Sequence, residues 1–534
     1  MLTRKKILLT LFFSALAVRL VFAASFFQSF FASYHLVPGL DMQTLLRYSE
    51  WIGENNYPPF FTFHRLVVFL TWFLNNKIHA VWAIFAIQSI IGILGTLCIA
   101  DLTLKFTRHR IISLITGIAA SFYLPFLVYE FSILKETFAV NFMLLTFWSM
   151  IYALRKRFNL KSMMLFGFCC FLTIEGRIAV IPAIGIYGLY CAFKMYKRKS
   201  LKRVFASAIL PLILLVSAAF FNSFNWKFSP FFDVLNYNLQ YNTEVGNTDP
   251  KSDISEQVPV KSSRLHSIIQ TAKNASMRMP QLFKTGELPE NQNIYFWCRK
   301  IPQFNLFISP GLLIPCAVAG IMVLLLTGAW KTRYGILLIP VITLALPLCA
   351  REVIGRYRLM LVPYFFMISA CAAAVFIRLK SPRKRAISIF GAGIGVLFSF
   401  HNSEVPEKIR LADHGAYAIA AARTPGADPE KVIDEHLIYW KESNYSSQTA
   451  FDMLMDQLLR FQKTELLRET AVAALCNGKI PSDTIYYFTA WSYALDNQPQ
   501  KVWEYLVKIK KLPPDKEQKA IMLINDTKKI LNNR

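Results

Sequence analysis

The 534 residues are 54% hydrophobic and 14% aromatic but only 17% charged, whereas an average soluble domain is about 25% charged. This composition excludes a disordered chain, a small disulfide-stabilised domain and an ordinary cytosolic enzyme. The net charge of +26 lies within residues 1–401, because residues 402–534 hold 18 basic and 18 acidic side chains. Positive charge therefore accompanies the apolar part of the chain, which argues against a nucleic-acid-binding protein.

Apolar runs that are long enough, or nearly long enough, to cross a bilayer recur along residues 1–401. Such runs are too long for barrel strands, and backbone groups in lipid must be hydrogen-bonded internally, so the expected fold class is all-α. Arg19 inside the first run, together with the many runs that follow, favours an uncleaved helix over a signal peptide. We predict about eleven transmembrane helices, near 7–27, 79–101, 111–131, 136–154, 163–175, 178–193, 204–222, 305–329, 334–350, 359–378 and 386–401.

Basic clusters such as KFTRHR, RKRFNLK and RLKSPRKR fall on alternate connections between these runs. The positive-inside rule places them in the cytoplasm, so the opposite connections are extracytoplasmic. Among these are a first external loop at 28–78 and a long external loop at 223–304. The apolar segment FFTFHRLVVFLTWFL within 28–78 is expected to lie at the membrane interface, because a further span would break the charge pattern.

The tail at 402–534 follows an odd number of spans and is therefore also expected outside the cytoplasm. It reads as helical near 408–423, 429–442, 448–474, 484–496 and 499–511. One segment, DTIYYFTAWSYALDNQPQKVWEYLVKI, resembles a tetratricopeptide-type helix pair, although the strict 34-residue period is not evident and a generic helical bundle is the alternative. The chain is thus expected to comprise a transmembrane domain at 1–401 and a helical, tetratricopeptide-like domain at 402–534.

Charged residues gather on the predicted external connections, where acidic and basic groups together suggest a carboxylate site beside an anion site. Arginines can bind a lipid phosphate bidentately and stabilise it as it leaves. A carboxylate can deprotonate an acceptor hydroxyl, and direct displacement of the phosphate would invert the anomeric centre. No nucleotide-binding motif of the GxxxxGK[ST] or GxGxxG type is present in the sequence.

Five segments of weak motifs follow one another in order. They are LDMQTLLRYSEWIGENNYPP with Asp41 and Tyr48, ILKETFAVNFMLL with Lys135 and Glu136, GFCCFLTIEGRIAVIP with Arg177, NYNLQYNTEVGN with Asn247, and GRYRLMLVPYF with Arg356, Tyr357 and Arg358. In this order the chain resembles the bacterial lipid-linked-sugar glycosyltransferases of the GT-C superfamily. It is most similar to the branch of the dolichyl-phosphate-mannose–protein mannosyltransferases and the lipid A aminoarabinose transferases. Two departures from the family pattern are a longer spacing from Asp41 to Tyr48 and an isoleucine after Arg177.

The resemblance implies a multi-pass glycosyltransferase of the bacterial inner membrane with an extracytoplasmic active site and a polyprenyl-phosphate-linked sugar as donor. The acceptor, which could be a lipid, a protein or a glycan, stays open. Asp41 would be the catalytic base, assisted by Glu136 or Glu130. The residues expected to bind the substrate or its phosphate are Arg177, Arg356, Arg358, Tyr357, Lys135, Asn247 and Tyr48.

Simpler interpretations of these residues stand beside the functional ones. Asp41 could cap the helix that begins at Met42. Glu136 could be an acidic residue in the first turn of its helix, where the helix dipole favours negative charge. Arg177 could be an interfacial anchor. No CxxC motif or His/Cys cluster indicates a metal site. A divalent cation such as Mg²⁺ or Mn²⁺ is left open, since Asp41, Glu130 and Glu136 could ligate one if their loops meet.

Two other functions are also open. A glycan ligase or polymerase of the O-antigen type would depend on an arginine and a histidine in the long loop, for which His266 is the candidate. A lipid or solute transporter would carry charges within its spans and would show inverted repeats. No repeat of one half in the other is evident in the sequence.

Overall fold

The computed structural model describes residues 3–53, 65–176, 180–196, 273–287, 289, 292–351, 355–401 and 408–532. In these ranges the chain is helical and contains no β-strand, as the composition predicts for a membrane helical bundle. The chain divides into two compact units, Met1–Ser25 with Thr44–Lys408, and Phe26–Gln43 with Ile409–Arg534. The second unit thus includes part of the predicted first external loop in addition to the tail.

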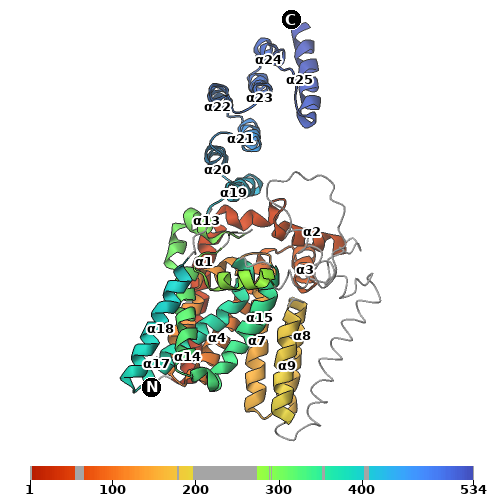
Figure 1. The fold of residues 1–534 in the computed structure, drawn as a ribbon. Coiled ribbons are helices and arrows are strands. Elements are labelled where there is room, and N and C mark those ends of the chain that lie inside the picture. Colours follow the sequence, from red (N-terminus) through yellow and green to blue (C-terminus); the bar gives the residue numbers. More distant parts are fainter. Residues whose placement is uncertain are drawn as a thin grey trace, which may run out of the picture. The chain divides into compact units, whose positions relative to one another are not determined.

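The first unit is a bundle of helices that run roughly side by side (Figure 1). Its longer helices are α1 (Arg4–Phe27), α2 (Asp41–Gly53), α4 (Trp82–Thr107), α5 (Arg110–Ser121), α7 (Glu136–Arg155), α8 (Leu160–Gly176), α9 (Ile181–Tyr196), α14 (Pro310–Leu326), α15 (Leu338–Arg351), α17 (Val362–Arg378) and α18 (Pro382–Phe400). Its short helices are α3 (Arg65–Trp72), α6 (Leu124–Glu130), α13 (Ile294–Lys300) and α16 (Gly355–Arg358). Single 3-10 or π turns are η3 (Phe73–Lys77), η5 (Met279–Phe283), η6 (Pro302–Leu306), η7 (Ala329–Lys331), η8 (Arg333–Leu337) and η9 (Leu359–Leu361).

Four helical segments in the described residues are long and apolar enough to cross a membrane: α1, α4, α7 and the segment Gly355–Arg378 that contains α17. α5, α8, α9, α14 and α15 are shorter apolar helices. Each predicted run therefore corresponds to helix, except that the run near 204–222 lies outside the described residues. α17 is the centre of the bundle: it packs against α4, α5 and α14, while α4 also packs against α7.

One predicted span, 111–131, is broken into α5 and α6. The break falls at Phe122 and Tyr123, where the backbone instead pairs with a distant segment: Leu124 N–H donates to Ile308 O (2.9 Å) and Ile308 N–H donates to Phe122 O (2.8 Å). Pro125 in the first turn of α6 cannot donate a backbone hydrogen bond, so a helix that continued through this point would lose one. The break matters for the site, because it turns α6 toward Glu287 and α13.

The segment that was expected at the interface within 28–78 is described from Arg65 onward. It forms α3, of eight residues, followed by the π turn η3. A helix of eight residues is far shorter than the roughly 17 that a span requires. The described part therefore does not cross a bilayer as a helix by itself.

The tail contains seven helices in the described residues, α19 (Leu411–Arg423), α20 (Pro429–Glu442), α21 (Gln448–Arg460), α22 (Thr464–Asn477), α23 (Ser482–Leu495), α24 (Pro499–Leu506) and α25 (Pro514–Asn532). Each packs against the next along the chain, and they form the stacked row in Figure 1. The predicted stretch 448–474 is two helices, because the chain turns between Phe461 and Lys463. α25 was not predicted from the sequence.

The tail helices recur at a nearly constant spacing. α19, α21, α23 and α25 begin 37, 34 and 32 residues apart, and α20, α22 and α24 begin 35 residues apart. This spacing is close to the 34 residues of a tetratricopeptide repeat. The period is visible in the helix starts although the residues themselves do not repeat.

Residues of the first external loop complete the second unit. The 3-10 helix η1 (Phe30–Leu36) packs on α19, where the rings of Phe31 and Tyr417 lie 4.8 Å apart. The hydroxyls of Ser33 and Thr424 are hydrogen-bonded at 2.8 Å, and Arg423 donates to the carbonyl of Leu36 at 2.5 Å. These contacts explain why Phe26–Gln43 groups with the tail.

Candidate active site at one end of the bundle

A bidentate ion pair joins two helices in the interior of the first unit. Arg19 of α1 donates from Nε and Nη2 to the two carboxylate oxygens of Glu130, at 2.7 and 2.6 Å, and both side chains are only 3% exposed. A third guanidinium nitrogen of Arg19 donates to the carbonyl of Ala15. An unpaired charge at this depth would be costly, so the pair accounts for an arginine in an apolar helix. Both carboxylate oxygens of Glu130, a predicted catalytic residue, therefore accept hydrogen bonds from Arg19.

Glycine on α4 makes room for this pair. A Cβ at Gly92 would overlap the carboxylate of Glu130 and approach Arg19, and a Cβ at Gly95 would overlap the amide of Asn141. Gln88, on the same face of α4, donates to the carbonyl of Leu134 at 2.9 Å. Residues 88, 92 and 95 follow helical spacing, so this face of α4 receives the polar groups of α6, α7 and the turn between them.

Two more predicted site residues lie at the end of the turn at 131–135 and at the start of α7. Glu136 is the first residue of α7 and is 1% exposed. Lys135 precedes it and is half-buried. Glu130, Lys135 and Glu136 therefore lie at the same end of the bundle.

A second buried ion pair lies where α16 begins the central membrane segment. Arg358 donates to the carbonyls of Lys284 and Gly286 at 2.6 and 3.2 Å, and its other terminal nitrogen lies 3.2 Å from Glu287 Oε1. The side chains of Arg358 and Glu287 are 4% and 9% exposed. Arg358 thus fastens the segment 284–287 to α16. In this arrangement it serves as a positioning residue, which differs from its predicted contact with phosphate.

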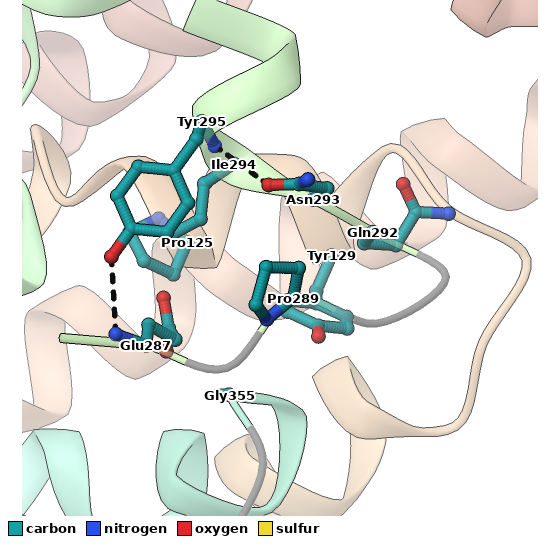
Figure 2. Close-up of a pocket in the computed structure, with 9 residues that line it drawn as sticks. All are labelled: Pro125, Tyr129, Glu287, Pro289, Gln292, Asn293, Ile294, Tyr295 and Gly355. Atoms are coloured by element: carbon teal, nitrogen blue, oxygen red, sulfur yellow. Dashed lines mark hydrogen bonds between the residues drawn. The ribbon is translucent and has the colours of Figure 1, made fainter. Parts of the chain in front are cut away.

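Glu287 also lines a small pocket with residues from α6 and α13 (Figure 2). The hydroxyl of Tyr295 accepts a hydrogen bond from the backbone N–H of Glu287 at 3.1 Å, while Oε2 of Glu287 has no hydrogen-bond partner in the described part of the chain. The cavity is about 10 Å³, which is the space of one water molecule. Its lining residues are Pro125, Tyr129, Glu287, Pro289, Gln292, Asn293, Ile294, Tyr295 and Gly355.

Gly355 is required by the close approach of Glu287. A Cβ at position 355 would lie 2.7–2.8 Å from the Glu287 side chain, which is closer than carbon atoms pack. Tyr129, the neighbour of Glu130, lines the same pocket. The two buried ion pairs, Arg19–Glu130 and Arg358–Glu287, therefore belong to one end of the bundle.

Arg356 and Tyr357 complete the predicted Arg-Tyr-Arg motif. The Arg356 guanidinium lies over the Tyr357 ring, 5.0 Å from its centroid, and donates to the Tyr357 hydroxyl at 3.3 Å. Tyr357 is buried, whereas Arg356 is half-buried. Of the two arginines in this motif, Arg356 is therefore the more accessible to a ligand.

The remaining predicted residues are distributed differently. Asp41 begins α2 and falls in the second compact unit, whereas Glu130, Glu136 and Arg358 belong to the first. Tyr48 lies on α2 with its ring 5.6 Å from that of Trp51. Arg177 and Asn247 lie outside the described residues.

No group of three or more His, Cys, Asp or Glu side chains is close enough in the described residues to hold a metal ion. Of the three carboxylates that the sequence offers as ligands, Glu130 has both oxygens bound by Arg19. The arrangement therefore does not place Glu130 to ligate a cation.

Two residues of the site were not among the sequence candidates. Arg19 had a signal, because an arginine in an apolar run needs a partner within the bundle. Glu287 had none, since an isolated glutamate in a long polar loop resembles any solvated residue.

The opposite end of the bundle is basic. Arg4 pairs with Asp101 at 2.8 Å, Arg155 donates to the carbonyl of Lys105, and Arg378 donates to the carbonyl of Thr107. Glu136 and Arg155 lie at the two ends of α7, which is 20 residues long, or about 30 Å of helix. The acidic and basic site residues and the cluster of basic groups therefore occupy opposite ends of the membrane unit.

No protein-family model and no curated protein matches the chain. Among solved structures it is similar to the archaeal oligosaccharyltransferase AglB from Archaeoglobus fulgidus, determined in complex with an inhibitory peptide and a dolichol-phosphate. The TM-score is 0.34 and the sequence identity 14%, over 79% of this chain and 59% of that one. The chain thus spans less than two thirds of that protein's length. A similarity of this size assigns no activity to the chain.

Proposed function

We propose that the chain is an integral membrane glycosyltransferase. In this proposal it transfers a sugar from a polyprenyl-phosphate-linked donor to an acceptor outside the cytoplasm of a bacterium, with inversion at the anomeric carbon. The ordered motifs of the sequence support this assignment. The observation that carries it is the position of the Arg-Tyr-Arg motif, at the start of a membrane-spanning segment and beside a buried carboxylate.

This position suits a lipid phosphate in two ways. The phosphate of a polyprenyl lipid lies at the membrane surface, which is also the level of residues that begin a spanning helix. Arg356 is half-buried there, and a guanidinium is a strong ligand for a phosphate that gains charge as it leaves. The donors of Arg358 are used to hold the segment 284–287. In this proposal Arg358 therefore does not bind the phosphate itself but fixes the position of α16 and of Arg356.

The proposed reaction needs one base and one anion-stabilising group. Asp41 takes the proton of the acceptor hydroxyl, and the acceptor oxygen forms a bond to the anomeric carbon. The bond from that carbon to the phosphate oxygen breaks, and the electron pair leaves with the phosphate, which Arg356 stabilises. Lys135, Tyr48 and Glu136 are proposed to line the site, as are Arg177 and Asn247.

The test is a transfer assay with purified full-length protein and labelled polyprenyl-phosphate sugars, read as release of polyprenyl phosphate. We expect Asp41→Asn to reduce the rate at least about 100-fold, as for removal of a general base. Arg356→Gln should reduce it by a similar factor through loss of an electrostatic contact.

Glu50→Gln is the matched control, because Glu50 is an exposed carboxylate on the same helix as Asp41. It should leave the rate unchanged. Full activity of folded Asp41→Asn would contradict the role of Asp41, and the absence of transfer with every polyprenyl-phosphate donor would contradict the function.

A further inference from the structure

A second cavity, larger than the one beside Glu287, lies at the basic end of the bundle. It has a volume of about 600 Å³, which falls in the range of small-molecule and lipid headgroup sites. Its lining residues come from the ends of α4 and α7, from α9, and from the turns that precede α15 and the start of that helix. The length of the bundle separates it from the proposed active site.

One side of this cavity is cationic. Lys105, Arg108, Arg155 and Arg333 line it. The acidic group nearby, Asp101, is held by Arg4, Lys105 and the indole of Trp148, at 2.6–2.8 Å.

The three arginines of this wall carry uncompensated charge. Arg108, Arg155 and Arg333 are exposed, and none of them pairs with a carboxylate among the residues that the structure describes. Arg155 donates to the carbonyl of Lys105 and Arg333 to the hydroxyl of Tyr334, both of which are neutral oxygens. Three unneutralised guanidinium groups around one cavity form a site for a multiply charged or bidentate anion.

The other side of the cavity is apolar. It is formed by Ile151 of α7, by Ile336 of the turn η8, and by Ile339 and Ile342 at the start of α15. Ile342 is 59% exposed and Trp330, also in the lining, is 43% exposed. A soluble anion would gain nothing from this wall, whereas the acyl chains of a lipid would be buried against it.

We propose that this cavity binds the phosphate headgroup of an anionic membrane lipid, on the side of the membrane that the positive-inside rule assigns to the cytoplasm. The phosphate lies among Arg108, Arg155 and Arg333, and the glycerol and acyl chains follow the isoleucines of η8 and α15. Basic pockets between transmembrane helices at this level suit anionic lipids. The site is independent of the proposed sugar transfer.

The experiment measures lipid-dependent stability of the full-length protein in detergent, by tryptophan fluorescence on heating. Phosphatidylglycerol is titrated against phosphatidylcholine with the same acyl chains and against inorganic phosphate. We expect phosphatidylglycerol alone to raise the unfolding midpoint in a saturable way, because a ligand that binds only the folded state stabilises it by mass action.

Arg155→Gln with Arg333→Gln should weaken this effect. The half-saturating lipid concentration should rise about tenfold for each arginine removed, the loss expected for one charge-assisted hydrogen bond. The matched control is Arg383→Gln with Lys384→Gln, two exposed basic residues in the first turn of α18 that do not line the cavity. It should retain the wild-type titration.

A second variant, Ile339→Trp, leaves every charge in place and fills the apolar side of the cavity. It should also weaken binding, so a folding defect of the double arginine variant would not end the test. Equal stabilisation by phosphatidylcholine or by inorganic phosphate would overturn the proposal, as would equal losses in the control pair, which would indicate diffuse surface attraction.

Discussion

At the scale of single residues, a buried polar contact in the membrane unit is built from Arg19, Glu130 and Gly92. Arg19 was visible in the sequence as an anomaly in an apolar helix, but its partner was not, because Glu130 and Glu136 flank the same turn. Only the structure shows that Glu130 accepts two of the three hydrogen bonds that the Arg19 guanidinium donates. The choice depends on the direction in which α6 runs after the break at Phe122, which periodicity does not reveal.

Removing one member of this pair should be far more costly than removing both. Arg19→Met leaves Glu130 buried without its partner, so we expect a loss of about 3–5 kcal/mol in the free energy of unfolding. Arg19→Met with Glu130→Met should recover most of that loss. Unfolding in mixed detergent micelles would measure both. A double variant as unstable as the single one would contradict this role of the pair.

Gly92→Ala should destabilise the same contact by steric overlap. The added methyl would collide with the Glu130 carboxylate, and overpacking of this kind costs about 1–3 kcal/mol. Gly188→Ala is the control, because Gly188 is also helical and has no atom within 4 Å of its would-be Cβ. Both variants are compared by their unfolding midpoints, and equal effects would show that helix propensity alone explains the change.

At the scale of elements, helix positions in the membrane unit followed from apolar runs, but their ends did not. The run 111–131 is continuous in hydropathy and yet breaks, because a distant segment at Ile308 supplies the backbone hydrogen bonds. In the tail, 448–474 was predicted as one helix, since its apolar spacing continues through the turn at Phe461. Likewise, the sequence predicts that Arg358 contacts a phosphate. It does not reveal the contacts of Arg358 with the carbonyls of Lys284 and Gly286.

Arg358 should determine how firmly the segment 284–287 is attached to α16. Arg358→Lys keeps the charge but removes the planar fork that reaches two carbonyls and Glu287 at once. We expect faster amide hydrogen exchange at 284–287, with exchange in α7 unchanged. Protection of 284–287 equal to that of the wild type would show that Thr285, whose N–H donates to Ser399 O, holds the segment unaided.

The tail should lose stability in mild acid around α20. Burial lowers the pKa of His436 below its ordinary value of 6.5, although a hydrogen bond with the Val432 carbonyl partly opposes this shift. The unfolded state therefore binds a proton more readily than the folded state, so the stability contributed by neutral His436 is complete above about pH 6.5 and is lost as the pH falls below it.

Hydrogen exchange of the α20 amides in the full-length chain would measure this loss, compared at about pH 8 and about pH 5 after correction for intrinsic rates. His436→Gln should remove much of the pH dependence. The prediction would be wrong if His436→Gln kept the full dependence.

At the scale of the whole molecule, composition and charge were sufficient to predict an all-helical membrane protein with a helical tail. They were not sufficient to predict which residues belong to each compact unit. Residues 30–36 pack on α19 through contacts between aromatic rings about 390 residues apart in sequence. The repeat spacing of the tail was equally hidden, since it is carried by where helices begin and not by shared residues.

The proposed function requires that a polyprenyl phosphate binds at the end of the bundle formed by α16, α6 and the start of α7. The decisive measurement is a structure of the full-length protein with bound polyprenyl phosphate. We expect phosphate density within hydrogen-bonding distance of Arg356. Density for that phosphate only among Arg108, Arg155 and Arg333, at the other end of α7, would contradict the proposed site.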